Sequence, residues 1–278
     1  MKKFKVGLQL YSVREDMEKD MEATLKKVKE IGYDYVEFAG YFGHTAEQVR
    51  EWLDKYGLTC VSVHQGYEVF LENEQAEIDY LKTIGAKFCA VPWMGVDKHK
   101  GSENFEQTVA DFKKVGTALK NAGIQMLYHN HDFEFDRYED KFLLDWLYES
   151  LPADLLQTEV DTCWVRYAGY DPAEYLRKYT GRSPVVHLKD FICKNFNAGA
   201  VYALIDNSGN DDNKPKSKDE AGFEFRPVGH GVQDIPAILQ ASEEAGADIV
   251  IVEQDQSNDR PAMEAVKMSR EYLKSLGL

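Results

Sequence analysis

The sequence predicts an α/β fold, a single (β/α)8 TIM barrel, on three observations. The first is a repeated unit of an amphipathic helix, a glycine and a short apolar segment, which recurs along the chain. The second is that eight such apolar segments alternate with helices, an order that implies parallel pairing through right-handed crossovers. The third is the length of 278 residues, because eight such units occupy roughly 250 residues in a barrel.

The repeated unit is clearest where the chain passes from helix to strand. The glycines at these positions are Gly32, Gly57, Gly85, Gly123 and Gly246. Glycine suits the left-handed residue just past a helix, and the chain then turns directly into a strand. Ahead of the first of them, Leu25, Val28 and Ile31 recur at helical spacing.

Eight segments are expected to be strands. In chain order they are residues 6–10, 35–38, 60–63, 88–91, 125–128, 156–160, 185–188 and 249–252. A doubly wound open sheet is the structural alternative, but no GxGxxG motif follows the first strand. The barrel is therefore favoured as one domain over residues 1–278, and no second domain is expected.

One connection breaks the rhythm of the repeat. Between the seventh strand and the helix expected near residue 235, the chain includes the charged run NSGNDDNKPKSKDEAG. So long a connection is usually an active-site loop or a disordered segment. We expect a loop insertion at about 191–228 over the active-site mouth, because barrel active sites lie at this end. Residues 210–220 are expected in solvent, with the flanks 192–205 and 223–228 packed over the mouth.

The composition excludes some partners. The chain has 33 Lys+Arg against 48 Asp+Glu and a formal charge of -15, so the field repels a nucleic acid backbone. No apolar run approaches the roughly 18 residues of a membrane span, and the N-terminus lacks the features of a signal peptide. The 4 Cys are widely spaced without a CxxC pair, as in reduced cytoplasmic proteins. A cytoplasmic enzyme without a nucleic acid or membrane partner is expected.

Polar residues stand where the expected strands end. They are Glu37, His64, the segment 128–134, Glu159, Asp161, His187, Lys189, Asp190, Glu253 and Asp255. A buried charge without a partner costs several kcal/mol, so a shared ring of ligands explains their recurrence at one barrel end. Imidazole and carboxylate together suit a divalent metal cation, Mn²⁺, Co²⁺, Zn²⁺ or Fe²⁺.

Strand alternation refines this expectation. His129 and His131 fall on one side of the fifth strand. Neighbouring strands then bring His129, Asp161, His187 and Glu253 toward one centre. Any one of these residues alone is more simply explained as structural, and it is the set of four that favours a metal.

Three weaker features each have two readings. Trp93 and Trp164 are either rim packing or the apolar face on which a sugar ring stacks. The turn around His230 is either a tight turn or a backbone site for a phosphate or sugar hydroxyl. Lys189 either pairs with Asp190 or holds a substrate oxyanion.

Six motifs carry a family resemblance. They are LQLYSVR (8–14), YHNHDFEF (128–135), EVDTCWVRYAG (159–169), VVHLKD (185–190), VGHG (228–231) and IVEQDQS (251–257). In this order they resemble the xylose isomerase-like TIM barrels, and more narrowly the sugar phosphate isomerase/epimerase family with its tagatose epimerase, inosose dehydratase and 3-keto-glycoside lyase relatives. The resemblance covers essentially the whole chain and specifies the fold, but not the substrate.

The resemblance implies a divalent metal held by Asp161, His187 and Glu253 on the last three strands. On the fifth strand the chain departs from the family, because His129 stands where many members have Glu. Either His129 or Glu134 completes the shell. Three carboxylates and one His match the family's usual shell and favour Glu134, whereas strand geometry favours His129.

The resemblance also implies proton abstraction next to a carbonyl of a small keto sugar, sugar phosphate or polyol, through a metal-stabilised enediolate. His131 and Glu253 are the expected bases, and Lys189 is the expected partner of an oxyanion. The substrate-binding residues are expected to be Glu37, His64, Trp93, His129, Trp164 and His230.

Four functions remain open at this point. An isomerase or epimerase leads, and a lyase or dehydratase acting by β-elimination on a 3-keto-glycoside or keto-inositol uses the same machinery. An apurinic-site endonuclease has a related fold but a trinuclear zinc cluster, which the charge of -15 and the 7 His disfavour. A non-catalytic sugar-binding barrel is disfavoured by the ring of ligands. A homo-oligomer is compatible with the family.

Overall fold

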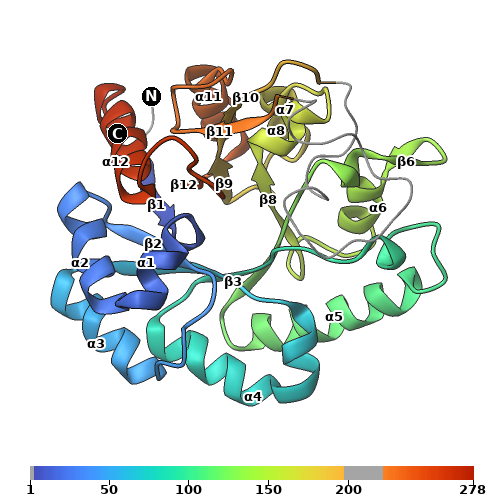
Figure 1. Cartoon of the computed structure of the whole chain (residues 1–278). Coiled ribbons are helices and arrows are strands. Elements are labelled where there is room, and N and C mark those ends of the chain that lie inside the picture. The colour runs from blue at the N-terminus through green and yellow to red at the C-terminus, as the bar shows by residue number, and fades with distance from the viewer. Residues whose placement is uncertain (1–2, 197–221) are drawn as a thin grey trace.

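Eight parallel strands close into a barrel in the computed structural model, which describes residues 3–196 and 222–278 (Figure 1). The strands are β1 (Lys5–Gln9), β2 (Tyr35–Phe38), β3 (Thr59–His64), β4 (Phe88–Val91), β5 (Gln125–His129), β8 (Gln157–Asp161), β9 (Val185–Leu188) and β12 (Ile249–Val252). Their order around the barrel is β1-β12-β9-β8-β5-β4-β3-β2, so the first strand pairs with the last. The predicted (β/α)8 TIM barrel is confirmed, as are all eight predicted strands.

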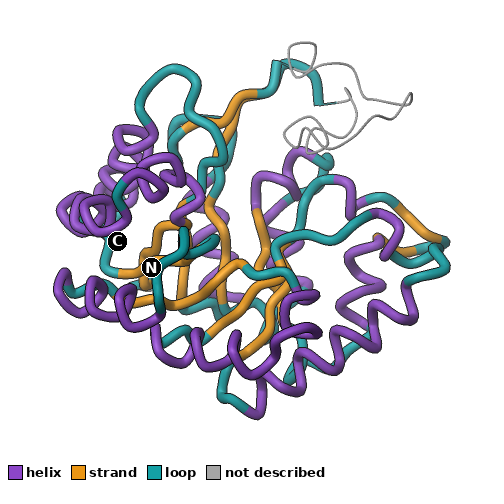
Figure 2. Tube along the Cα trace, turned by 60° about the horizontal axis from the view of Figure 1, so that its bottom comes forward, coloured by secondary structure: helices purple, strands orange, loops and turns teal. Residues whose placement is uncertain are grey.

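Helices lie outside the ring of strands, as Figures 1 and 2 show. They are α1 (Arg14–Lys19), α2 (Met21–Ile31), α3 (Ala46–Tyr56), α4 (Tyr67–Ile84), α5 (Phe105–Asn121), α6 (Leu143–Glu149), α7 (Thr162–Tyr167), α8 (Pro172–Lys178), α11 (Ile235–Ala245) and α12 (Ala262–Ser275). Within residues 3–196 and 222–278, 3-10 turns lie at Leu10–Val13, Val96–Lys98 and Phe133–Phe135. In the described part of the chain, no helix combines the length and apolar character that crossing a membrane requires.

The helix-glycine-strand unit has the expected backbone conformation. All five glycines have positive φ; Gly57, for example, has φ 65° and its N–H bonds to carbonyls in the last turn of α3. A side chain is strained in this region, whereas glycine enters it freely. The glycine therefore ends the helix and redirects the chain into the next strand.

The interior of the barrel changes character along the strands. At one level it is apolar, filled by Val61, Ala90, Leu127, Val185, Ile249 and Ile251. Toward the carboxyl ends of the strands the inward side chains become polar, and these polar residues are also buried. The apolar layer closes the barrel from below, so the polar groups face one another and the mouth.

Two small antiparallel ribbons were not predicted. One pairs β6 (Arg137–Tyr138) with β7 (Lys141–Phe142). The other pairs β10 (Asp190–Ile192) with β11 (Glu224–Arg226), which are the two flanks of the long connection. Residues 197–221 within the predicted insertion at 191–228 lie outside the described residues. In the second flank, the ring of Phe223 stacks on Trp164.

Candidate active site

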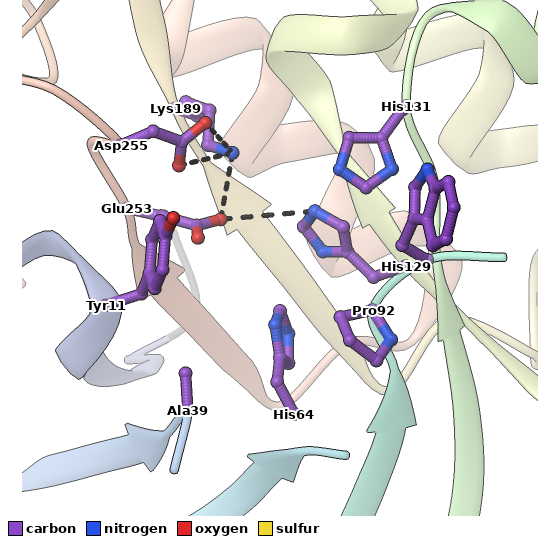
Figure 3. A pocket seen from close by; sticks show the side chains of 10 residues that line it. Tyr11, Ala39, His64, Pro92, His129, His131, Lys189, Glu253 and Asp255 are labelled. Atoms are coloured by element: carbon purple, nitrogen blue, oxygen red, sulfur yellow. Dashed lines mark hydrogen bonds and ion pairs between the residues drawn. The ribbon is translucent and has the colours of Figure 1, made fainter. Parts of the chain in front are cut away.

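A cavity of about 400 Å³ opens at the carboxyl ends of the strands (Figure 3). Its lining residues come from the ends of seven barrel strands or the loops that follow them: Tyr11, Ala39, His64, Pro92, Trp93, His129, His131, Lys189, Glu253 and Asp255. This volume suits a monosaccharide-sized molecule. The cavity therefore lies where barrel enzymes hold their substrates.

Polar residues beside this cavity occur in pairs two positions apart on four neighbouring strands and their extensions. The pairs are His129 and His131, Glu159 and Asp161, His187 and Lys189, and Glu253 and Asp255. Residues two apart in an extended chain share a face, so each strand presents one polar group deep in the barrel and another nearer the mouth. Two layers of charge result.

The layer nearer the mouth, which we call the rim cluster, consists of Asp161, Lys189, Glu253 and Asp255. The Lys189 Nζ lies 3.0 Å from both Asp161 Oδ2 and Glu253 Oε2. It also lies 3.1 Å from Asp255 Oδ1. One buried ammonium is thus shared by three carboxylates, and Figure 3 shows it between Glu253 and Asp255.

The layer below, which we call the deep cluster, consists of Glu37, His64, Glu159 and His187. The His64 Nε2 lies 2.7 Å from Glu159 Oε1 and 3.0 Å from Glu37 Oε1. The His187 Nε2 lies 3.2 Å and 2.9 Å from the same two oxygens. The side chain of Gln9 donates to Glu37 Oε1 at 2.6 Å. Two imidazoles therefore bridge two carboxylates inside the barrel.

His129 stands between the two layers. Its Nδ1 lies 3.4 Å from Glu159 Oε1, and its Nε2 lies 3.5 Å from Asp161 Oδ2 and 4.0 Å from Glu253 Oε2. His187 also spans both layers, because its Nδ1 lies 2.9 Å from Glu253 Oε2. Each of these imidazoles presents one ring nitrogen to each cluster.

Two sets of side chains have the composition of a metal site. His129, Asp161, His187 and Glu253 form one set, and His64, His129, Glu159 and His187 form the other. Within each set the ligand atoms lie within 4.8 Å of one another, and every residue is buried. Imidazole and carboxylate are the donors of Zn²⁺, Mn²⁺, Fe²⁺ and Co²⁺ sites. The first set borders the cavity, so the residues present fit a catalytic divalent cation.

The groups in and beside the rim cluster differ in their pKa values and so in their protonation states. Burial raises the pKa of Asp255 to about 6 despite the Lys189 ammonium. Burial acts the same way on Glu253, but there Lys189 and His187 prevail and hold the pKa well below its usual range. Burial and then Lys189 depress the pKa of His131. At neutral pH, His131 is a neutral imidazole facing the cavity, and Glu253 is ionised.

In the deep cluster the neighbouring carboxylates outweigh burial, so the imidazole pKa values are raised and not lowered as in His131. Burial disfavours charge on His64, but Glu37 and Glu159 raise its pKa to about 10. The same carboxylates raise the pKa of His187 well above its usual value. Burial would raise the pKa of Glu37, but the two imidazoles hold it well below its usual range. Burial and the neighbouring Glu37 carboxylate raise the pKa of Glu159 to about 7. In the protein without a metal, the deep cluster therefore pairs two protonated imidazoles with an ionised Glu37 and a Glu159 that titrates near neutrality.

Glu134 lies outside both candidate metal sets. Its carboxylate accepts from the Tyr128 hydroxyl and, at 2.5 Å, from the backbone N–H of His131. Burial raises its pKa to about 8, which keeps the carboxyl largely neutral. Of the two alternatives for the strand-five ligand, the geometry favours His129, and Glu134 instead braces the turn that carries His131.

The expected substrate-binding residues divide into three groups. His64, Trp93 and His129 line the cavity. Glu37 lies beneath it in the deep cluster, while Trp164 is fully buried with Lys189 Nζ 5.3 Å above its ring. Trp164 therefore packs behind the rim cluster rather than at the cavity wall.

His230 lies away from the cavity, on an exposed turn held by Asp190. The Asp190 carboxylate accepts from the backbone N–H groups of Gly229, Gly231 and Gln233 at 3.0, 2.9 and 3.1 Å. A Cβ at Gly231 would lie 2.2 Å from Asp190 Oδ1, so only glycine fits. The tight-turn reading explains this motif, because Asp190 already uses the N–H groups that a phosphate would need. Asp190 is also not the partner of Lys189.

Sequence reasoning did not select four residues of this site: Gln9, Tyr11, Glu159 and Asp255. For Glu159 and Asp255 a signal existed, since each lies two residues from a selected carboxylate and shares its face of the strand. Tyr11 and Gln9 belong to the LQLYSVR motif, but nothing else in the sequence marked them as site residues.

Known proteins share this architecture. An inosose dehydratase from Geobacillus kaustophilus is 25% identical to the chain over 191 residues, a match that covers 61% of each protein. The chain thus spans about three fifths of the length of that relative. A sugar phosphate isomerase/epimerase structure from Parabacteroides distasonis has a TM-score of 0.77 at 21% identity, covering 99% of this chain and 95% of that one.

A third relative contains a metal. The structure of the IOLI protein with a binding zinc atom has a TM-score of 0.69 at 15% identity and covers 98% of this chain and 97% of that one. At these identities the two solved structures establish the likeness of fold.

The family assignment rests on most of the chain. Residues 25–276 match the family described as Xylose isomerase-like TIM barrel, a span that contains seven of the eight barrel strands. The closed barrel and the buried polar layers at its carboxyl end agree with that match. The chain belongs to the xylose isomerase-like TIM barrel family.

Proposed function

We propose that the chain is a divalent-metal-dependent isomerase or epimerase that removes a proton next to the carbonyl of a small keto sugar, sugar phosphate or polyol. The observation that carries the proposal is the convergence of His129, Asp161, His187 and Glu253 within 4.8 Å at a cavity that His131 also lines. A cation held by these four residues, Mn²⁺, Co²⁺, Zn²⁺ or Fe²⁺, supplies polarisation of the substrate carbonyl and its neighbouring hydroxyl.

The proton-moving groups flank this centre. Figure 3 shows His131 on one side of His129, with Lys189, Glu253 and Asp255 on the other. His131 is neutral at physiological pH because burial depresses its pKa, so it can take a proton from carbon. Asp255, with a pKa of about 6, can hold or release a proton near neutrality. Two proton-transfer groups on different sides of one cavity suit removal and return of a proton.

Lys189 positions charge in this arrangement. Its ammonium is fixed by three carboxylates and remains at the cavity wall. The oxygen of the substrate gains negative charge as the proton leaves carbon, and a nearby ammonium stabilises that charge. Trp93, exposed at the mouth, provides an aromatic face for the sugar ring.

A dehydratase is the second candidate, favoured by the inosose dehydratase relatives. It uses the same first step, in which a base takes the proton next to the carbonyl. The electron pair then forms a carbon–carbon double bond and expels the β-hydroxyl, which takes up a proton and leaves as water. Asp255 in its protonated form is the group at this cavity that can donate that proton. The two functions differ only in the fate of the electron pair once the proton has left carbon.

The test is a substrate panel with product identification. The purified protein, loaded separately with Mn²⁺, Co²⁺ and Zn²⁺, is incubated in D₂O with ketohexoses, keto-inositols and 3-keto-glucosides. Deuterium incorporation with a rearranged or epimerised sugar supports the isomerase. Loss of water from a keto-inositol, or release of an aglycone from a 3-keto-glucoside, supports the lyase. If no member of the panel exchanges its α-proton under any metal, the proposed chemistry is wrong.

A further inference from the structure

The deep cluster has a composition that the proposed reaction does not require. Glu37, His64, Glu159 and His187 are buried side chains, and of the four only His64 lines the cavity. The four do not simply support one rim ligand, because they also converge on one another. The distances between their nitrogens and oxygens run from 2.7 to 3.2 Å.

We propose that the deep cluster binds a second divalent cation, held by His64 Nε2, His187 Nε2 and the carboxylates of Glu37 and Glu159. Four protein ligands without an open position are the coordination of a structural zinc site, whereas a catalytic site keeps one position open. A tetrahedral ion with bond lengths near 2.1 Å holds its ligand atoms about 3.4 Å apart. The nitrogens and oxygens of the deep cluster lie 2.7 to 3.2 Å apart, so they must move outward slightly when the ion binds.

Unsatisfied atoms at the cluster point to a missing ligand. Among the described residues, Glu37 Oε2, Glu159 Oε2 and His129 Nδ1 are buried and make no hydrogen bond. Their side chains belong to or face the deep cluster, since His129 Nδ1 lies 3.4 Å from Glu159 Oε1. A buried polar atom left without a partner costs about 1–3 kcal/mol. A cation can satisfy the carboxylate oxygens, which the protein leaves open.

The charge of the two clusters matches two divalent ions. Glu37, Glu159, Asp161, Glu253 and Asp255 are five buried carboxylates, and the ammonium in contact with them is that of Lys189. If the imidazoles are neutral, as metal ligands must be, four negative charges remain uncompensated. Two divalent cations cancel that charge, whereas with a rim ion alone the deep carboxylates keep protonated imidazoles as their partners.

The two ions can divide the shared imidazoles. His129 Nε2 faces Asp161 and Glu253, and these three leave an open position toward the cavity. His187 Nε2 faces the deep carboxylates, while its Nδ1 can donate to Glu253 Oε2 at 2.9 Å. With both ions bound, His187 is therefore a ligand of the deep ion, and the rim ion keeps three of the four ligands of the proposed catalytic centre. The rim ion then serves the reaction, and the deep ion fixes the floor beneath it.

The test counts ions in the full chain. Metal is removed with a chelator, Zn²⁺ or Co²⁺ is added, and bound ions per chain are measured by native mass spectrometry in the wild type and three variants. The deep variant is Glu37→Gln with Glu159→Gln, and the rim variant is Asp161→Asn with Glu253→Gln. Asp145→Asn is the control, because Asp145 is a buried carboxylate on α6 that accepts from Tyr175 and Tyr179 instead of imidazoles.

The inference predicts two ions per chain in the wild type and the control, and one in either double variant. A single ion that is lost in the rim variant and kept in the deep variant would overturn the second site and leave the proposed function intact. A single ion lost only in the deep variant would contradict the rim centre and, with it, the proposed function. If the wild type binds no ion, both are wrong.

A second test uses the wild-type protein alone, so it does not require the variants to fold. Crystals grown with Zn²⁺ give an anomalous difference map at the zinc edge. The inference expects one peak between His64 Nε2 and Glu159, separate from a second peak beside Asp161. A map with no peak at His64 would refute the deep site.

Discussion

The rim and deep clusters share strands β8 and β9, yet their charges are arranged differently. The rim cluster shares one ammonium among three carboxylates and borders an open cavity. The deep cluster pairs two imidazoles with two carboxylates and lies almost entirely below the cavity. On β8, and on β9 with its extension, a shift of two residues thus separates a deep group from a rim group, whereas Glu253 and Asp255 both belong to the rim cluster.

This difference separates two kinds of function in one polar core. Charges at the mouth can change partner when a substrate arrives, because water and ligand reach them. Charges beneath the floor cannot, and loss of one partner leaves the other buried and unpaired, which costs about 3–5 kcal/mol. We therefore expect rim substitutions to act on activity and deep substitutions to act mainly on stability.

The largest effect is expected from Asp161→Asn with Glu253→Gln. The pair removes two ligands of the rim centre, and a metal supplies several kcal/mol of transition-state stabilisation, which corresponds to a loss of roughly 1000-fold or more in kcat/KM. The midpoint of thermal unfolding should fall less than in Glu37→Gln with Glu159→Gln. Kinetics on the active panel substrate and thermal melts check both parts. If Glu37→Gln with Glu159→Gln lowered kcat/KM more than Asp161→Asn with Glu253→Gln did, and lowered the unfolding midpoint less, the division of roles would be contradicted.

A smaller loss of activity is expected for His131→Asn, because this residue is proposed to move a proton and not to bind the metal. General acid–base catalysis contributes roughly 100-fold to 10,000-fold, so kcat should fall by about that factor while metal content stays unchanged. The acidic limb of the kcat–pH profile should also change, since the pKa of His131 lies below its usual value. Unchanged kcat with an unchanged profile would exclude His131 as a base.

Glu134 tests a carboxyl outside both clusters. Burial raises its pKa from 4.5 to about 8, and the adjacent Tyr128 hydroxyl and His131 N–H do not reverse this. His99, 3.8 Å away, offers no compensating charge because burial lowers its own pKa to about 4. A raised acid pKa stabilises the fold fully below pH 4.5, and that contribution is lost as pH rises toward 8.

Glu134→Gln keeps the side chain neutral at every pH. Relative to the wild type, its free energy of unfolding should therefore increase by about 1–3 kcal/mol between roughly pH 5 and pH 8. Urea denaturation at the two pH values measures this difference, with Asp145→Asn as the comparison carboxyl. A difference that is constant with pH, or that changes in the opposite direction, would show that Glu134 is ionised in the folded protein.

The smallest effect is expected for Trp93→Ala. Trp93 lines the mouth with 42% of its surface exposed, so the variant should fold normally and keep its metal. Loss of a stacking face should raise KM a few-fold, in line with about 1 kcal/mol of aromatic contact, and leave kcat near the wild-type value. A large fall in kcat would place Trp93 closer to the reacting atoms than the cavity indicates.

Much of the fold was readable from the sequence because its signals are local. The glycines after helices and the apolar runs beyond them placed all eight strands, and β2, β4, β9 and β12 have the predicted bounds. The antiparallel ribbon of β10 and β11 was missed because it joins segments on both sides of residues 197–221. Such a pairing leaves no periodic signal within either segment.

The sequence predicted which residues form the site, but not how deep in the barrel each one lies. Alternation tells which side of a strand a residue occupies, and this was enough to group His129, Asp161, His187 and Glu253. It does not reveal how far each strand is shifted against its neighbours, and β2 and β3 pair with a register irregularity between Val36 and Glu37. The separation into deep and rim clusters depends on that register, so it required the three-dimensional structure.

The most direct test of the central claim is α-proton exchange as a function of bound metal. Metal-free protein is titrated with Mn²⁺, Co²⁺ or Zn²⁺ in D₂O containing a keto-inositol, and deuterium incorporation is followed by NMR beside the rim variant. The proposed function predicts exchange that rises with occupancy of the rim centre and is lost in Asp161→Asn with Glu253→Gln. Exchange at the same rate in the metal-free protein, or full exchange in the rim variant, would contradict it.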